Sequence, residues 1–245
     1  MVQTNKRRFV RNIGLGFLTL ILSACTALPP VSSTVAAEQS ATPLPEAPPN
    51  NLQGWWSVKF QMPWQPDTEP NWSIGTWIAA DLLGPVIQGH HTELELWRVH
   101  RRAARDAGGY TFSFIFYASA QTAAKVYAEI NVHPLIAELK QRGLLAAVQQ
   151  DELNQNNKPA IADTSDSKWP PSIRQTWPYF IMGASQMWLE LVKELNKELQ
   201  NISDPQARYQ LLQSRLTDLW RKNGQHAWLH HLSALYGYSP LEIEF

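Results

Sequence analysis

The sequence predicts an α+β protein, with an antiparallel β-rich N-terminal part followed by a helical C-terminal part. In the first half of the folded region, aromatic and β-branched residues gather in short runs, one of which alternates clearly with polar residues. In the second half, apolar residues recur three and four positions apart, which is the period of an amphipathic helix. The 245 residues are 44% hydrophobic and 17% charged, a balance that excludes a wholly disordered chain.

Four segments predict strands. In the clearest of them, Phe112, Phe114 and Phe116 fall on one face, because side chains of a strand point to opposite faces in turn. The turn-forming segment 106–109 precedes this strand and favours a second strand that pairs back onto it, although the arginines of that second segment also fit a helical spacing. The predicted strands are 55–60, 72–80, 93–99 and 110–117.

Five segments predict helices. Ser119 can cap the first helix, and Pro134 suits the first position of the second, which Gly143 ends. The third spans Trp188 to Leu199, and the fourth starts at Asp204-Pro205 and ends at Gly224. The last helix covers about 225–236. The polar, aperiodic residues 149–168 predict a long loop within a single α+β domain over 51–245.

Composition excludes several function classes. The chain has 21 Lys and Arg against 21 Asp and Glu, so it has no global positive field for nucleic acid. Its single Cys excludes an internal disulfide framework, a Cys-rich zinc site and an iron–sulfur cluster. No Gly-rich phosphate-binding loop is present in the sequence.

The N-terminus has the composition of an export signal. Residues 1–12 contain four Lys and Arg and no acidic residue, and residues 13–24 are almost entirely apolar. A run of about 12 apolar residues is too short to span a bilayer, which needs roughly 20. The combination predicts a secretory signal peptide over residues 1–24.

The end of this run, Leu22-Ser23-Ala24-Cys25, resembles the bacterial lipobox. The resemblance implies that Leu22, Ser23 and Ala24 form the recognition site of the lipoprotein signal peptidase. It also implies that Cys25 carries a covalent diacylglyceryl lipid on its sulfur and becomes the new N-terminus. The alternative is an ordinary or uncleaved signal peptide in which the Cys is incidental.

The expected location follows from the same resemblance. Thr26 stands where an Asp tends to retain lipoproteins at the inner membrane, so the resemblance implies the outer membrane, facing the periplasm, if the cell is Gram-negative. Residues 25–50 comprise the lipidated Cys and a Pro-rich tether. As a flexible coil, this tether would span about 25–30 Å. Loss of residues 1–24 leaves a net charge of −4, which weakens any nucleic-acid role further.

Two candidate binding sites stand out in the body of the chain. On a strand, His91, Glu93 and Glu95 would share one face and could hold a divalent metal ion, although an ordinary polar surface cluster is the simpler interpretation. Trp64, Trp169 and Trp177 lie beside prolines and could form an aromatic binding platform for a protein or glycan of the envelope. The alternative is that these tryptophans cover the core.

Three other patterns have weaker functional interpretations. Ser185, with Asp204 or Asp218 and with His226 or His230, follows the residue order of an α/β-hydrolase triad, but Met187 replaces the second glycine of the nucleophile turn. His226 and His230 have a metal-friendly spacing, yet they fall opposite the apolar face of their predicted helix, which favours a solvated pair. The arginines at 98, 101, 102 and 105 could face an anionic ligand or form a solvated surface.

These patterns favour a lipid-anchored envelope lipoprotein that is a non-catalytic binding or assembly factor. The anchor would hold it at a membrane, and its partner would be another envelope component. The alternative is an envelope hydrolase or metal-dependent enzyme that uses the His and acidic residues.

Overall fold

The computed structural model describes residues 52–155 and 157–241, which belong to one compact unit, Pro45–Phe245. The predicted signal peptide, the lipobox-like segment with Cys25 and the whole predicted tether, residues 25–50, therefore lie outside the described residues. The elements in chain order are β1 (Gln53–Met62), α1 (Ser73–Ile78), the π-helix η1 (Ala79–Leu83), α2 (Gly84–Gly89), β2 (Leu96–Ala103), β3 (Tyr110–Ser119), α3 (Ala120–Val132), α4 (Pro134–Gln141), β4 (Ala147–Gln150), the 3₁₀ helix η2 (Ile161–Thr164), α5 (Pro171–Glu198), α6 (Pro205–Gly224), the π-helix η3 (Gln225–His230) and α7 (His231–Leu235).

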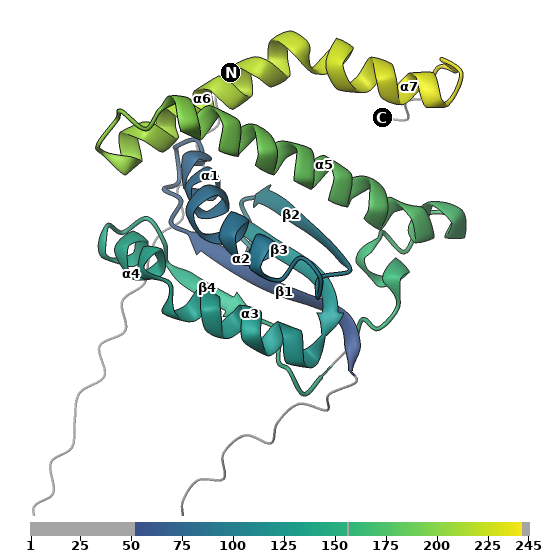
Figure 1. The fold of residues 1–245 in the computed structure, drawn as a ribbon, viewed down its shortest axis with the longest axis horizontal. Helices are drawn as coiled ribbons and strands as arrows, with labels where there is room; N and C mark the ends of the chain where they lie inside the picture. Colours follow the sequence, from purple (N-terminus) through teal and green to yellow (C-terminus); the bar gives the residue numbers. More distant parts are fainter. Residues whose placement is uncertain (1–51, 156, 242–245) are drawn as a thin grey trace, which may run out of the picture. The chain divides into compact units, whose positions relative to one another are not determined.

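The four strands form one antiparallel sheet in the order β2-β3-β1-β4, and long helices follow it in the sequence (Figure 1). This arrangement confirms the predicted α+β class with its β-rich N-terminal part and helical C-terminal part. The strands predicted at 55–60 and 110–117 are also confirmed. The segment predicted at 93–99 is a strand from Leu96 onward, and it pairs with β3 across a turn in which Gly109 adopts φ +54°.

One face of the sheet carries the main core. Trp56 of β1 is aligned with Phe116 of β3, and Val58 with Phe114, so aromatic and aliphatic side chains meet directly across the strands. Helices α1, α2, α3 and α4 add their apolar faces to this cluster. On the opposite face, a small cluster of Trp55, Leu96 and Tyr117 lies at one end of the sheet, where η2 packs against it.

The strand predicted over residues 72–80 is wrong, because α1 and η1 occupy this segment. Every residue from Ser73 to Ala79 is buried, so the segment has no exposed face. An apolar run that is buried all round shows neither a period of two nor a period of 3.6, and its composition cannot separate a strand from a helix.

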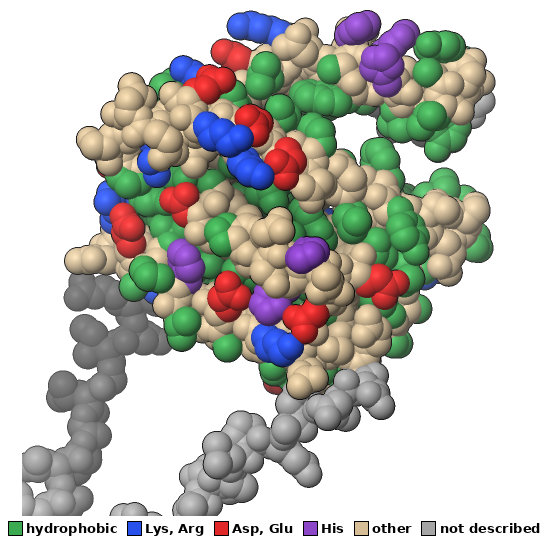
Figure 2. All heavy atoms as spheres, in the orientation of Figure 1, with side chains coloured by type: hydrophobic (Ala, Val, Ile, Leu, Met, Phe, Trp, Pro, Cys, Tyr) green, Lys and Arg blue, Asp and Glu red, His purple; other side chains and the backbone are tan. Residues whose placement is uncertain are grey.

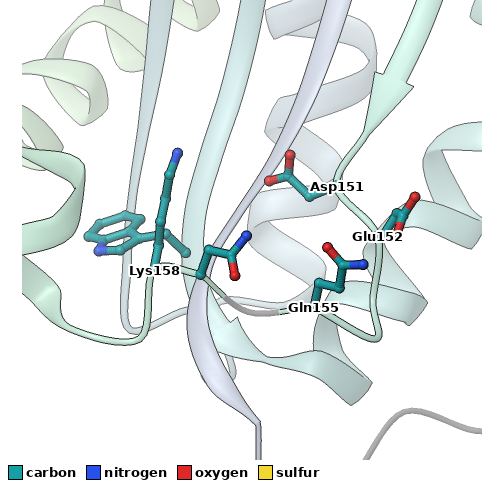
Figure 3. Close-up of a pocket in the computed structure, with 6 residues that line it drawn as sticks. Asp151, Glu152, Gln155 and Lys158 are labelled. Carbon is teal, nitrogen blue, oxygen red and sulfur yellow. The ribbon is translucent and has the colours of Figure 1, made fainter.

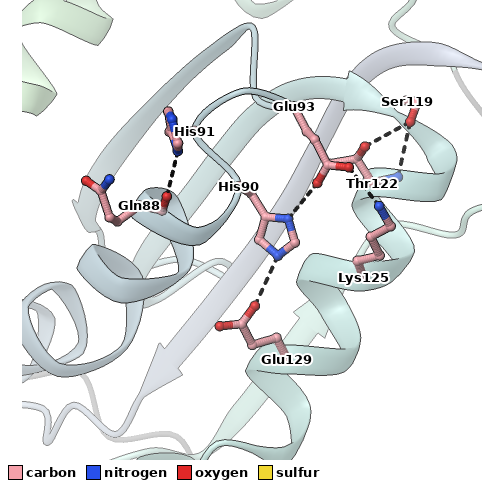
Figure 4. Close-up of polar contacts among 8 residues, drawn as sticks. All are labelled: Gln88, His90, His91, Glu93, Ser119, Thr122, Lys125 and Glu129. Carbon is pink, nitrogen blue, oxygen red and sulfur yellow. Dashed lines mark hydrogen bonds and ion pairs between the residues drawn. The ribbon is translucent and has the colours of Figure 1, made fainter.

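The predicted ends of α3 and α4 are confirmed. The Ser119 hydroxyl accepts a hydrogen bond from the Thr122 backbone N–H at 3.1 Å, as an N-cap does (Figure 4). Pro134 is the first residue of α4, and Gly143 adopts φ +68° just after that helix ends.

The loop predicted over 149–168 is only partly confirmed. Its first two residues end β4, which hydrogen-bonds to β1, and residues 161–164 form η2. The Trp55 indole N–H points to the carbonyl oxygens of Ala160 and Ile161 at 3.2 and 3.0 Å, and it fixes the loop against the sheet. A polar sequence thus adopts an ordered path because an aromatic donor from β1 meets its backbone.

Helix α5 is longer than predicted and runs along the edge strand β2 (Figure 1). It contains Pro178, which cannot donate a backbone hydrogen bond to the Arg174 carbonyl. The Ser165 hydroxyl donates to that carbonyl instead, at 2.8 Å. The helix therefore continues through the proline without leaving this acceptor unpaired.

Helix α6 begins and ends as predicted, at Pro205 and Gly224, but the helical path continues beyond it. Asp204 caps it through the backbone N–H groups of Gln206 and Ala207. Gly224 has helical φ −59°, and a Cβ there would lie 3.0 Å from the Trp220 ring and 3.1 Å from the Trp228 ring. The glycine is thus needed for close approach of two indoles, and the helix runs on through η3 and α7. None of the helices over the described ranges is both long and apolar enough to cross a membrane.

Candidate functional site

A cleft of about 670 Å³ lies between α5 and the segment that runs from η1 and α2 to the start of β2. Its volume is within the range of pockets that bind small molecules or anchor side chains of a partner. Its floor is apolar and its rim is polar. The floor residues are Ile87, Leu94, Trp97, Met182 and Leu189.

Strand β2 and helix α5 supply three of the five floor residues, and α2 and the turn before β2 supply the other two. Trp97 points from the core-facing side of β2, where its ring lies 6.4 Å from that of Phe114. Met182 and Leu189 are seven residues apart on α5, so they fall on one face, two turns apart. Trp97, Leu94 and Leu189 are each less than a tenth exposed, so the floor is a part of the core that the cleft leaves uncovered.

The rim carries charges of both signs. On α5, Lys193 pairs with Glu190 at 3.5 Å, and the Gln186 amide donates to the same carboxylate at 2.9 Å. Figure 2 shows acidic and basic side chains side by side over this helix, beside hydrophobic surface. Charges of both signs on the rim can orient a bound partner through ion pairs, and they do not select for a partner of one net charge.

A hydrogen-bonded network closes one end of the cleft. Asn196 donates to the Tyr209 hydroxyl at 3.2 Å, Tyr209 donates to Asp81, and the Trp77 indole N–H donates to Asp81 at 2.9 Å. Burial first, and then the hydrogen bond to Asp81, raises the pKa of Tyr209, which therefore stays a proton donor. The network joins α5, α6, η1 and α1 through direct hydrogen bonds.

A charged cluster holds the 90–95 turn at the other side of the cleft (Figure 4). His90 contacts Glu93 through Nδ1 at 2.8 Å and Glu129 through Nε2 at 3.0 Å, and Lys125 pairs with Glu93 at 2.7 Å. The hydrogen bond from Lys125, followed by that from His90, lowers the pKa of Glu93. These contacts tie the turn to α3 and so place His91 and Glu95 at the cleft rim.

The predicted strand face of His91, Glu93 and Glu95 does not form, because these residues lie in the turn before β2. Glu93 is engaged by His90 and Lys125, and the His91 ring donates from Nδ1 to the Gln88 carbonyl at 2.8 Å. Within 52–155 and 157–241, no group of three or more His, Cys, Asp or Glu side chains is placed to hold a metal ion.

The three platform tryptophans fall into two places. The rings of Trp169 and Trp177 lie 5.4 Å apart, and the Arg98 guanidinium stacks 5.1 Å from the centre of the Trp177 ring. Trp64 instead packs under Arg105, whose guanidinium carbon is 3.3 Å from its ring centre. Trp64 and Trp177 therefore each contact an arginine, and Trp64 is not stacked with the other two tryptophans.

The arginines of β2 face opposite ways. Arg98 and Arg102 alternate with Arg101, which stacks 4.6 Å from the Trp188 ring and donates to Gln213 and Thr76 at 2.9 and 2.7 Å. Burial lowers the pKa of Arg101 to about 10. It pairs with neutral oxygens rather than a carboxylate among the described residues, so it serves to join β2, α1, α5 and α6.

The hydrolase-like pattern is contradicted by the fold. Ser185 lies in the middle of α5, only 4% exposed, rather than on a turn between a strand and a helix. Its hydroxyl donates to the Ile181 carbonyl at 2.7 Å and accepts from the Val99 backbone N–H at 3.2 Å. Asp204 is committed to the α6 cap, so the residues of the pattern are not brought together as a triad.

The histidines after α6 are exposed, as predicted for a solvated pair. The rings of His226 and His230 stack 5.4 Å apart, and His231 adjoins both. The opposite face is only partly buried, since Trp228 and Leu232 are half-buried and Leu235 is 81% exposed.

A smaller hollow of about 210 Å³ lies beside Trp55 in the 151–158 segment. Figure 3 shows Asp151, Glu152, Gln155 and Lys158 around it. Its volume is below the usual size of a ligand pocket.

Sequence reasoning missed the cleft as a site, although it named His91 and Glu95. The sequence of α5 carried one signal of the cleft: Met182 and Leu189 are two helical turns apart and so lie on the same face of the helix. Nothing in the sequence shows that this face passes beside the start of β2, because that contact joins residues about 85 positions apart.

Comparisons with protein families, curated proteins and solved structures found no match to this chain. The fold and the site define an α+β protein with an apolar-floored, polar-rimmed cleft beside its edge strand.

Proposed function

We propose that the protein is a lipid-anchored lipoprotein of the cell envelope, and that it acts as a non-catalytic binding or assembly factor. The cleft between α2 and α5 is the observation that carries the binding role. It offers an apolar floor for anchor side chains and a charged rim that orients the segment bound there.

The floor supports a peptide segment of another envelope protein as the ligand. A buried tryptophan, two leucines, an isoleucine and a methionine make the floor, and Met side chains adapt to different apolar partners. The mixed rim of Glu190, Lys193, Glu95 and His91 suits a segment that carries both signs of charge around one or two apolar anchors.

The lipobox supports the anchor. A lipidated Cys25, with a tether that spans about 25–30 Å as a coil, would keep the domain close to a membrane. Two acyl chains hold a protein far more firmly than one. The Cys25→Ser variant, followed by membrane fractionation and fatty-acid labelling in cells, tests this part: release from the membrane supports it.

Site-specific photo-crosslinking in cells tests the cleft. A photo-reactive residue at Gln186, on the rim, is expected to give one discrete adduct with an envelope protein. The same residue at Gln121, exposed on α3 away from the cleft, is the matched control and is expected to give none.

A second variant asks whether the cleft itself is occupied. Ala80→Trp fills the cleft wall, and it is expected to abolish the Gln186 adduct while the circular dichroism spectrum stays unchanged. Equal adducts from Gln186 and Gln121, or an adduct that Ala80→Trp leaves intact, would contradict a binding role for the cleft.

A further inference from the structure

Exposed large apolar side chains concentrate in two segments of the described chain. Nine exposed large apolar residues lie on α5 or after residue 219. Elsewhere in the described residues, only Val132 and Leu211 are large, apolar and exposed. We call eight of these nine residues the apolar tip and leave out Trp220, whose ring stacks on that of Trp228. Its members are Ile173, Tyr179 and Phe180 of α5, and Leu229, Leu235, Tyr236, Tyr238 and Leu241 after α6.

The apolar tip occupies one end of a helical hairpin. Helices α5 and α6 pack together and are joined by residues 199–204, so the first turns of α5 and the last turns of the chain are the parts farthest from that connection. Figure 1 shows both on the same side of the ribbon. Exposed apolar side chains that gather on one side of a domain mark a site of contact with a partner or a membrane.

The chain enters the folded domain on the side where α5 begins, near the α5 part of the apolar tip. Residue 52 precedes β1, and the Trp55 indole N–H of that strand contacts the Ile161 carbonyl of η2. Four residues further on, the Ser165 hydroxyl donates to the Arg174 carbonyl in the first turn of α5. A short series of direct contacts therefore links the start of β1 to the α5 part of the apolar tip.

The chain before residue 52 bears on which partner covers the apolar tip, because it would connect the domain to a lipid on Cys25. Residues 26–51 would span roughly 25–30 Å on average as a coil, so a lipid on Cys25 would keep the start of β1 near a bilayer. The tether thus favours a lipid surface as the occupant.

Composition also fits a lipid surface. Residues 168–189 and 220–241 contain Lys168, Arg174, Arg221 and Lys222 and no Asp or Glu, and Glu242 and Glu244 follow. Five of the eleven tryptophans lie in these two segments. Trp and Tyr favour the headgroup region of a bilayer, and basic residues favour anionic headgroups.

We propose that the apolar tip inserts into the headgroup region of an anionic lipid bilayer and orients the domain on the membrane. The tip makes a contact separate from the covalent lipid, and the proposal rests on the proposed anchor only for the nearness of the membrane. The cleft between α2 and α5 remains available to a protein partner.

Vesicle sedimentation of the chain that begins at Thr26 tests the proposal. This form has no lipid, and it retains the unit Pro45–Phe245 with the whole described core. Phosphatidylglycerol–phosphatidylcholine vesicles are expected to bind it. The double variant Phe180→Glu with Leu235→Glu is expected to bind about ten-fold less, because each change places a charge among groups that insert.

Val132→Glu is the matched control, because Val132 on α3 is 81% exposed, as is Leu235. It is expected to leave vesicle binding unchanged. Absence of binding by the starting chain, or an equal loss in Val132→Glu, would overturn the proposal. A dimer that the double variant converts to a monomer, with no vesicle binding by either, would also overturn it, since a second copy would then cover the tip.

The outcome is independent of the anchor. A chain that binds vesicles here but is not labelled by fatty acid at Cys25 in cells would refute the anchor and leave the tip contact supported. A chain that is labelled in cells but does not bind vesicles would do the reverse.

Discussion

At the scale of single residues, serine hydroxyls pair with backbone groups that have no partner in a helix or in the sheet, such as the Val99 N–H and the Arg174 carbonyl. The Val99 N–H faces out of the edge strand β2, and it would have no partner without the Ser185 hydroxyl of α5. An edge strand with free backbone groups invites pairing with another chain. Ser185 therefore has a structural role at the position where a nucleophile was considered.

The Ser185→Ala variant tests this role. It leaves a buried N–H unpaired, so the free energy of unfolding is expected to fall by about 1–2 kcal/mol in urea denaturation. Ser214→Ala, at an exposed position of α6, is the control and is expected to change it by less than about 0.5 kcal/mol. An equal effect of the two changes would show that the Val99 contact contributes nothing.

Three buried tyrosines make stability depend on alkaline pH. Burial raises the pKa of Tyr110, Tyr127 and Tyr209 above the ordinary value of 10.0, and each hydroxyl donates to a protein oxygen. In the unfolded chain these phenols ionise near that value. Because the folded pKa is the higher one, their stabilising contribution is complete below about pH 10 and is lost as the pH rises further.

At a pH somewhat above 10, these three phenols are expected to stay protonated in the folded chain. At the same pH, all seven tyrosines are expected to ionise in the chain unfolded by urea. Ultraviolet absorbance of phenolate measures both titrations, and the free energy of unfolding should decline over the same range. Coincident titration curves for the folded and unfolded chains would refute this account.

At the scale of the elements, the start of each capped helix was predictable because its signal is local. Ser119, Pro134 and Asp204 act through backbone groups two to four residues away, so the sequence alone contains the interaction. The same holds for the alternation in β3, where three phenylalanines face the core.

Errors arose where tertiary contacts decide the element. Residues 72–80 were predicted as a strand but form α1 and η1. Burial on all sides removes the periodicity that would have distinguished a helix from a strand. Gly224 ends α6 as predicted, but η3 continues the helical path after it. The glycine provides space for the stacked rings of Trp220 and Trp228, which are 5.5 Å apart. The cleft was missed for the same reason, since its walls meet only in the folded chain.

The cap of α6 offers a test at this scale. Asp204→Ala removes the acceptor for the Gln206 and Ala207 N–H groups, and it is expected to lower the free energy of unfolding by about 1 kcal/mol. Asp204→Asn keeps an acceptor oxygen and should come within a few tenths of a kcal/mol of the original chain. If Asn destabilises as much as Ala does, the charge rather than the hydrogen bond is responsible.

At the scale of the whole molecule, the account joins three features. One antiparallel sheet is covered on one face by helices, and α5 covers its edge strand and forms the cleft with α2. The end of the α5–α6 hairpin leaves apolar side chains exposed. A lipid on Cys25 would place this domain at a membrane, with the cleft free for a partner.

The covalent anchor is the claim on which the localisation and the class of partner depend. Mass spectrometry of the N-terminal peptide, from protein isolated from the membrane fraction, tests it most directly. The account predicts a chain that begins at Cys25 with a diacylglyceryl group on its sulfur. A chain that begins at Met1, unmodified and recovered from the soluble fraction, would contradict it.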